Sequence, residues 1–297
     1  MGVSVPMNNL GSIVLTTSHA GIHPGRASRL SSLPPFSPAA CRLLQLMGDA
    51  TAHFREVSRV LSLDAAISSQ LLRVANSALM GCQYDITSIT QAIFVLGIDR
   101  LRDIVITVAM KSYLGNGDDV FLRRAWRHNL ATGLWCEMLA DSCGVDQPTA
   151  YTAGMLHDIG RIALLKLFSH EYAAFMDSAM TGELDNLEAE RKLCDADHCQ
   201  VGEMLARKWK FPAMLQDVIA NHHCEVVAEA PRARLLVQAA CFAASASGFH
   251  TAGREPAWDP SRIEHLLPPG AHTGHLNYDQ SLESVALKLN QTECSLL

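Results

Sequence analysis

The sequence predicts an all-α protein. Apolar residues recur three and four positions apart along most of the chain, the spacing that places them on one face of a helix. The apolar–polar alternation of a half-buried strand is absent, and runs of β-branched residues are short. Of the 297 residues, 48% are hydrophobic but only 6% are aromatic, with Ala and Leu prominent. Such a composition favours helices packed on helices, in one large domain or two smaller ones.

Residues 31–114 are predicted to form an N-terminal lobe, a bundle of about five short helices. Leu33-Pro34-Pro35-Phe36 is a rigid extended lead-in, and Ser37-Pro38 offers an N-cap followed by proline at the first helical position. Asp64 and Ser88 can cap later helices, and Gly97 separates the fourth helix from the fifth. This lobe has almost no ionisable residues at positions that suggest a catalytic or metal-binding site, so its expected role is recognition or scaffolding.

A second helical lobe is predicted over residues 118–247, after a polar turn at 115–119. Apolar spacing places its helices at about 120–142, 148–158, 161–180, 185–194, 198–209, 212–223 and 232–247. The turn is too short to let two domains tumble independently, so the lobes are expected to share an interface.

The two ends of the chain carry weaker patterns. Residues 1–30 are rich in Gly, Ser, Pro and Thr and are expected to form a mobile arm. Residues 248–297 are expected to form a C-terminal tail, in which an amphipathic piece near 280–290 either docks on the core or stays loose.

Charge and composition exclude several partners. The net charge of -6 argues against nucleic acid or an anionic lipid surface as a partner. The basic stretch 123–127 is short and is read as a solvated helix face rather than a nucleic-acid site. The sequence contains no stretch of about 18 uncharged apolar residues, so no membrane span is predicted, and no secretion signal is visible. Nine cysteines without a Cys-x-x-Cys pair indicate reduced thiols, so a cytoplasmic location is expected.

The stretch 153–161, Ala-Gly-Met-Leu-His-Asp-Ile-Gly-Arg, carries the most chemistry. It predicts the end of an apolar helix, with His157 and Asp158 side by side and Gly160 closing the helix in the left-handed conformation. Neutral imidazole and ionised carboxylate are both good ligands for a divalent first-row metal. A helix cap or a surface ion pair is the alternative interpretation of this dipeptide.

Four further histidines stand on other predicted helices: His128, His198, His222 and His223. Each alone fits a cap or a hydrogen-bonded core residue, but facing helices can bring such side chains onto one ion. We expect His128, His157, Asp158 and at least one of the other three to face a common cavity. Several histidines with one carboxylate leave open positions on a metal, which permits metal-assisted hydrolysis of a phosphoester.

The order of these motifs resembles the HDOD group, the HD-related output domains of bacterial signalling proteins, over about residues 30–247. The matching segments are 33–35 (Leu-Pro-Pro), 71–78 (Leu-Leu-Arg-Val-Ala-Asn-Ser-Ala), 88–93 (Ser-Ile-Thr-Gln-Ala-Ile), 96–97 with 101–102, 154–160 (Gly-Met-Leu-His-Asp-Ile-Gly), 198–202, 209–212 (Trp-Lys-Phe-Pro) and 222–223. The resemblance implies an N-terminal bundle of about five helices packed on an HD-like helical core. It also implies a regulatory role in signal transduction, generally without demonstrated catalysis, in which a protein partner or a small messenger is bound.

The related HD phosphohydrolases supply a metal-ligand pattern for comparison. Their order of ligands implies His128 as the first, His157-Asp158 as the pair, and His198, His222 and His223 as the later histidines, for an ion such as iron, manganese or zinc. The pattern ends on an Asp, and Cys241 stands at that position. The Gly-Tyr-Pro loop of the HD-GYP phosphodiesterases is also absent after His223. The sequence therefore favours a non-catalytic regulatory module over the alternative, a metal-dependent phosphohydrolase of a nucleotide or cyclic dinucleotide.

Overall fold

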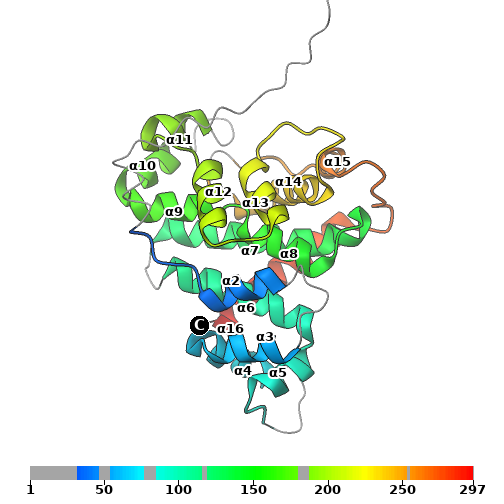
Figure 1. The fold of residues 1–297 in the computed structure, drawn as a ribbon. Coiled ribbons are helices and arrows are strands. Elements are labelled where there is room, and N and C mark those ends of the chain that lie inside the picture. The colour runs from blue at the N-terminus through cyan, green and yellow to red at the C-terminus, as the bar shows by residue number, and fades with distance from the viewer. Residues whose placement is uncertain are drawn as a thin grey trace, which may run out of the picture.

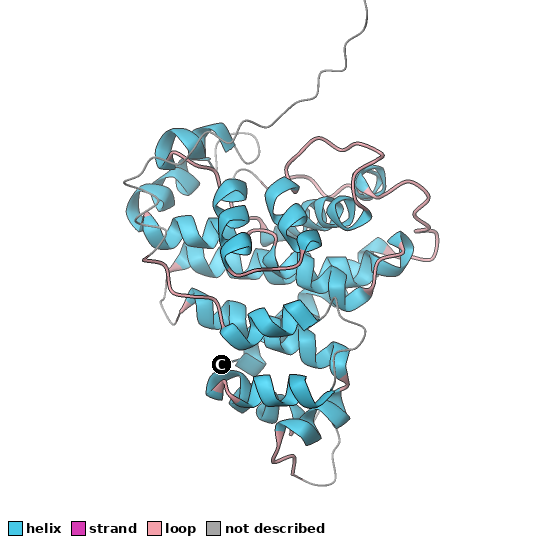
Figure 2. Cartoon of the chain, viewed as in Figure 1, coloured by secondary structure: helices cyan, strands magenta, loops and turns pink. Residues whose placement is uncertain are grey.

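The structure is a computed structural model that describes residues 32–46, 54–76, 85–115, 119–179, 187–252 and 255–296. Every regular element in these ranges is a helix, and none of the described residues forms a strand (Figures 1 and 2). The all-α prediction is confirmed. The arm predicted for residues 1–30 lies outside the described residues.

The N-terminal lobe contains five described helices: α2 (Pro38–Leu46), α3 (Phe54–Ser62), α4 (Ala65–Ala75), α5 (Ile89–Leu96) and α6 (Ile98–Leu114). Their starts follow the predicted caps. The Ser37 hydroxyl accepts a hydrogen bond from the Ala40 backbone N–H, and the Asp64 carboxylate accepts one from Ile67. Ser88 forms a reciprocal capping box with Gln91.

The second lobe is built around the long helix α7 (Val120–Cys143), whose middle turns are buried. Against it pack α8 (Gln147–Leu156), α9 (Ile159–Leu167) and α14 (Arg232–Ala244). The other helices of the lobe are α10 (Ser169–Ala179), α11 (Leu187–Cys194), α12 (His198–Lys208) and α13 (Ala213–Asn221), of which α10 and α12 contact α9 and α13 contacts α12 (Figure 1). The prediction of one helix over 161–180 is wrong, because the backbone leaves the helical conformation at Phe168 (φ -131°, ψ 44°). No glycine or proline marks this break. The Phe168 side chain is buried at the point where the two helices separate.

The two lobes contact each other directly. Phe36 of the lead-in stacks on Trp209, with ring centroids 5.4 Å apart, and both rings pack edge to face with Tyr113 at the end of α6. The ammonium group of Lys166 on α9 donates to the backbone carbonyls of Tyr113 and Leu114, at 2.8 and 3.0 Å. An aromatic cluster and a capped helix end therefore join the lobes across the short turn.

The C-terminal residues are more ordered than a tail. A π-helical segment (Ser245–Phe249) continues α14, and α15 (Pro260–Leu266) and α16 (Tyr278–Leu296) follow. Helix α16 docks on the core through the buried side chains of Val285 and Leu289, and Lys288 pairs with Glu137 of α7 at 3.2 Å. Of the two alternatives predicted for the amphipathic piece near 280–290, the structure shows that it docks on the core. The apolar spacing did not predict α15. None of the described helices is long and apolar enough to cross a membrane.

Asp103 on α6 is a largely buried carboxyl group whose Oδ1 atom has no hydrogen-bond partner among the described residues. Burial, with the nearby carboxylates of Glu137, Asp99 and Asp146, raises the pKa of Asp103 to about 8. The folded state therefore disfavours ionisation of this group relative to the unfolded chain.

We expect Asp103→Asn to stabilise the protein at neutral pH, by on the order of 1–3 kcal/mol. A raised carboxyl pKa contributes stability that is present below the unfolded value of about 4 and is lost as pH rises toward 8. The stability gained by Asp103→Asn should therefore grow as pH rises from about 4 toward 8 and should vanish below about pH 4. Thermal unfolding at several pH values measures this dependence. Asp85→Asn, at an exposed carboxyl that is not among the groups that shift the pKa of Asp103, is the matched control. A gain that does not depend on pH would contradict the assignment.

Candidate metal centre

The His-Asp pair lies in a tight turn between two helices. Helix α8 ends at Leu156, His157 and Asp158 form the turn, and α9 begins at Ile159. The pair is thus delivered by a helix end, as predicted. The role predicted for Gly160 is wrong, since this residue lies inside α9 and is not among the glycines with positive φ.

Gly160 instead allows a close approach of two helices. A Cβ atom at this position would lie 1.9 Å from the backbone oxygen of His198 and 2.6 Å from the backbone nitrogen of Gly202. Only a glycine fits where α9 passes this closely to the first turn of α12. This contact places His198, at the start of α12, beside the His-Asp turn.

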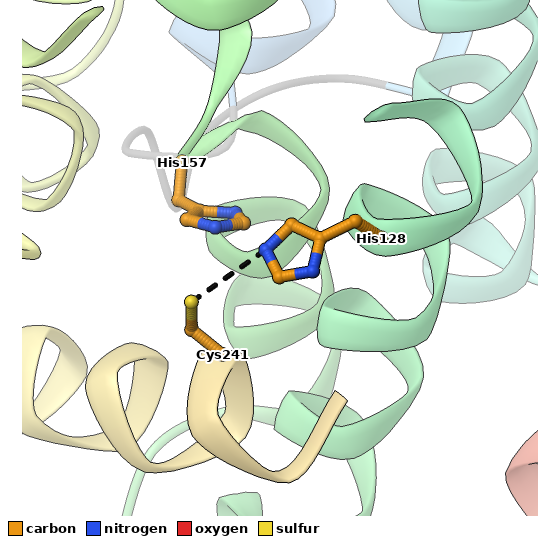
Figure 3. Close-up of side chains that lie close together, drawn as sticks. All are labelled: His128, His157 and Cys241. Carbon is orange, nitrogen blue, oxygen red and sulfur yellow. Dashed lines mark hydrogen bonds between the residues drawn. The ribbon is translucent and has the colours of Figure 1, made fainter. Parts of the chain in front are cut away.

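The first group of candidate ligands contains His128 of α7, His157 and Cys241 of α14. Their ligand atoms all lie within 4.8 Å of one another, and Cys241 Sγ is 3.5 Å from His128 Nε2. Figure 3 shows the sulfur and the two rings turned toward one another. Cys241, which stands at the position of the pattern's final Asp, thus lies beside His128 and His157, and its side chain is partly exposed.

The second group contains His198, His222 and His223, whose ligand atoms also lie within 4.8 Å of one another. The Nε2 atoms of His198 and His222 are 3.3 Å apart. Asp158 joins this group, with Oδ1 3.3 Å from His198 Nε2 and 3.9 Å from His222 Nε2. The rings of His157 and His222 meet edge to face, with centroids 4.9 Å apart. All six predicted site residues therefore come together, in two adjoining groups.

Four of the histidines are oriented in the same way. In each, Nδ1 is held by an acceptor behind the ring, which leaves Nε2 to face the other ligands. The acceptors are the carbonyl oxygens of Gly154 for His157 (2.7 Å), Ile219 for His222 (3.0 Å) and Phe249 for His128 (2.8 Å), and Glu190 Oε2 for His198 (2.7 Å). A carbonyl oxygen only accepts, so Nδ1 carries the proton in the first three rings and Nε2 presents a lone pair. Metal-binding histidines are held by such outer partners.

The protonation states of the buried groups suit a cation. Burial lowers the pKa of His157 to about 3. Burial and the neighbouring histidines likewise bring the pKa of His222 well below its ordinary value. Burial opposes ionisation of Asp158, but Arg161 and the nearby His198 and His157 outweigh it and lower the pKa of this carboxyl to about 2. At neutral pH two imidazoles are neutral and the carboxylate is ionised.

His198 differs from the other buried histidines. Burial and the Arg161 guanidinium oppose its protonation, while the carboxylates of Glu190 and Asp158 favour it, and the balance raises the pKa of His198 well above its ordinary value. His198 is therefore surrounded by charged side chains and not by other imidazoles alone.

The sequence reasoning missed the buried network behind the second group. Arg161 Nε donates to Asp158 Oδ2 at 2.7 Å, and Arg161 Nη1 donates to Glu190 Oε1 at 3.1 Å. Arg161 Nη2 lies 3.3 Å from both ring nitrogens of His198. The three-residue spacing of Asp158 and Arg161 was a usable signal. Glu190 gave none, because its helix 187–194 is strongly charged and reads as a solvated face.

The residues present fit a metal ion. His157 Nε2 is buried and has no hydrogen-bond partner among the described residues, while the buried Asp158 Oδ1 makes no hydrogen bond but lies 3.3 Å from His198 Nε2. An unpaired buried polar atom is costly, and a cation bound between these groups would satisfy both. Neutral imidazoles with one carboxylate are a ligand set of first-row divalent metals.

The fold and the centre together define an all-α protein with a site of the HD type, in which a His-Asp turn meets histidines from neighbouring helices. A model of the HDOD domain family matches residues 33–225, about two thirds of the chain. The chain therefore belongs to the HDOD domain family, which confirms the resemblance seen in the sequence.

An uncharacterized protein of Treponema pallidum is 24% identical over 209 residues, 66% of this chain. The chain spans 39% of the length of that relative.

Solved structures of several bacterial proteins share the fold. An HDOD domain protein of unknown function from Geobacter sulfurreducens superposes with a TM-score of 0.69 and 21% identity, over 91% of this chain and 97% of that one. A Shewanella amazonensis protein whose suggested activity is that of a phosphohydrolase gives 0.67 and 22%, over 92% and 97%. A Marinobacter aquaeolei protein suggested to act in signal transduction gives 0.65 and 19%, over 90% and 58%. At these identities the likeness concerns the fold.

Proposed function

We propose that this chain is a regulatory module of signal transduction that acts by binding a protein partner or a small messenger, without hydrolysing a phosphoester. Membership of the HDOD family and the Marinobacter neighbour suggested to act in signal transduction support the regulatory part. The composition of the metal centre supports the non-catalytic part.

Two departures from the HD hydrolase pattern carry this proposal. Cys241, which the HD pattern aligns with its final Asp, offers sulfur to the first group instead of a hard carboxylate. On the other side, Oδ2 of Asp158 is bonded to the buried Arg161, so one oxygen of the carboxylate is already occupied by a permanent cation. The centre keeps its imidazoles but has one hard anionic ligand fewer than the hydrolase pattern.

A divalent ion in this centre would be held by His128 and His157, with Cys241 as the third member of their group, while His198, His222 and His223 form the adjoining group with Asp158. In hydrolases such an ion polarises the phosphoryl oxygen and lowers the pKa of a bound water. The chain's own contribution is orientation, since Gly154, Ile219 and Phe249 fix three imidazole rings through their carbonyls.

The alternative is a metal-dependent phosphohydrolase acting on a nucleotide or cyclic dinucleotide. The observation that favours it is the convergence of several Nε2 atoms on an ionised carboxylate, which is the ligand set of such enzymes. The name of the Shewanella protein suggests the same chemistry for that protein.

Hydrolysis assays separate the two functions. The unmodified protein, supplied with Mn²⁺ or Fe²⁺, should hydrolyse neither a cyclic dinucleotide nor bis(p-nitrophenyl) phosphate faster than the Asp158→Asn variant. Metal-dependent hydrolysis that is lost in Asp158→Asn would overturn the proposal.

Cys241→Asp restores a hard anionic ligand and should tighten Mn²⁺ binding by about tenfold or more. Isothermal titration with MnCl₂ measures this change, with Cys224→Ser, at an exposed thiol, as the control. An unchanged Mn²⁺ affinity would mean that Cys241 does not occupy the ligand position.

A further inference from the structure

We propose that His128, His157 and Cys241 bind a single zinc ion, with Cys241 as a thiolate ligand, and that Arg161 keeps a second ion out of the histidine group beside it. This inference rests on the proposed function and specifies the metal, its ligands and its number.

The geometry of the first group fits tetrahedral zinc. Zn–N bonds of about 2.0–2.1 Å and a Zn–S bond of about 2.3 Å at tetrahedral angles place nitrogen and sulfur about 3.5 Å apart. Cys241 Sγ lies 3.5 Å from His128 Nε2, and a ring nitrogen of His157 falls within 4.8 Å of the ligand atoms of both. Small rotations of the side chains bring the three atoms onto one ion and leave the fourth position open.

The three ligands differ in whether the atom that would bind zinc still carries a proton. His128 and His157 each donate from Nδ1 to a backbone carbonyl, so both present an Nε2 lone pair. Because Nε2 of His128 carries no proton, the thiol of Cys241 is the donor in the contact between them. Zinc binding replaces that proton: one S–H bond breaks, one Zn–S bond forms, and one proton is released to the solvent.

The sulfur ligand selects the metal. A thiolate is a soft ligand that favours zinc, whereas Mn²⁺ and Mg²⁺ prefer hard oxygen ligands. Cys241 is partly exposed, so it is accessible to an incoming ion. Asp158, adjacent in the chain to His157, adds negative charge beside the ion.

The second group already contains a cation. The Arg161 side chain is 1% exposed, and its Nη2 atom lies 3.3 Å from both ring nitrogens of His198. Its guanidinium cannot lose its proton, and the salt bridges to Asp158 and Glu190 hold it in place. Both ring nitrogens of His198 are already engaged, Nδ1 by Glu190 at 2.7 Å and Nε2 by Asp158 at 3.3 Å. The Asp158 and Glu190 carboxylates are in turn committed to the guanidinium, so a dication at His198 and His222 would have to displace this network.

Cobalt titration tests the ligands and the number of ions. In the purified full chain, Co²⁺ should produce a thiolate-to-cobalt charge-transfer band that saturates at one ion per chain and is abolished by zinc. The band should disappear in Cys241→Ser, with zinc affinity weakened at least about tenfold. Cys199→Ser and Cys224→Ser, which alter thiols near the second group, should keep both the band and the affinity. Cys241→Asp should bind Co²⁺ without the band, which covers the case of a Cys241→Ser variant that does not fold.

Three results would overturn this assignment: no charge-transfer band in the unmodified protein, a band that survives Cys241→Ser, or saturation at two ions per chain. A missing band together with absent hydrolysis would leave the proposed regulatory function standing. Hydrolysis by the metal-loaded protein would contradict that function while leaving the zinc ligands intact.

Discussion

Gly160→Ala is expected to lower the free energy of unfolding by about 3 kcal/mol or more. The added methyl carbon would lie 1.9 Å from the backbone oxygen of His198 and 2.6 Å from the backbone nitrogen of Gly202. Both atoms belong to the main chain, so no side-chain rotation relieves the overlap and α9 must move away from α12. Because α9 begins directly after the turn that carries His157, a shift of α9 also moves this zinc ligand, so zinc affinity should fall together with stability. Chemical denaturation and a zinc titration of the same variant measure the two effects.

Gly274→Ala is the matched control for this substitution. No atom lies within 4 Å of a Cβ built at Gly274, and its φ lies outside the left-handed region. Its free energy of unfolding should therefore stay within about 0.5 kcal/mol of the unmodified protein. Equal stabilities of the two variants would show that α9 and α12 do not pack closely at Gly160.

Arg161→Gln is expected to lower the free energy of unfolding by about 3–5 kcal/mol. The guanidinium bonds Asp158 and Glu190, whose side chains are 3% and 1% exposed, so its removal leaves two buried carboxylates without their cation. Arg161→Lys should recover only part of the loss, because an ammonium group cannot reproduce the planar fork that reaches both carboxylates. Thermal unfolding of the two variants measures the difference.

Arg207→Gln provides the comparison at the surface. Arg207 pairs with Glu203 within one helix, and its side chain is 64% exposed, so its loss should cost at most about 0.5 kcal/mol. A loss of similar size at Arg161 would mean that water reaches the network and that the guanidinium is not fixed beside His198.

The fold could be read from the sequence where local chemistry decides it. The caps at Ser37, Asp64 and Ser88 and the break at Gly97 lie where the sequence placed them, because each depends on side chains within a few residues. The break at Phe168 carries no such local signal, and apolar spacing ran through it into one long predicted helix.

In the candidate site, likewise, the sequence predicted the ligands but not the long-range contacts that position them. The six predicted ligands and Cys241 come together, but the motif order that selected them says nothing about what holds the rings in place. Those partners include the carbonyls of Gly154, Ile219 and Phe249, and backbone atoms have no sequence signature. Glu190 looks like a surface residue until the fold buries it against Arg161. The close approach at Gly160 depends likewise on two segments about forty residues apart, which only the folded chain brings together.

Anomalous diffraction at the zinc absorption edge locates the ion most directly, in crystals of the full chain grown with one equivalent of zinc. We predict one strong peak, within bonding distance of His128 Nε2, His157 Nε2 and Cys241 Sγ. A peak among His198, His222 and His223, or no peak at either group, would contradict a single-ion centre built on Cys241.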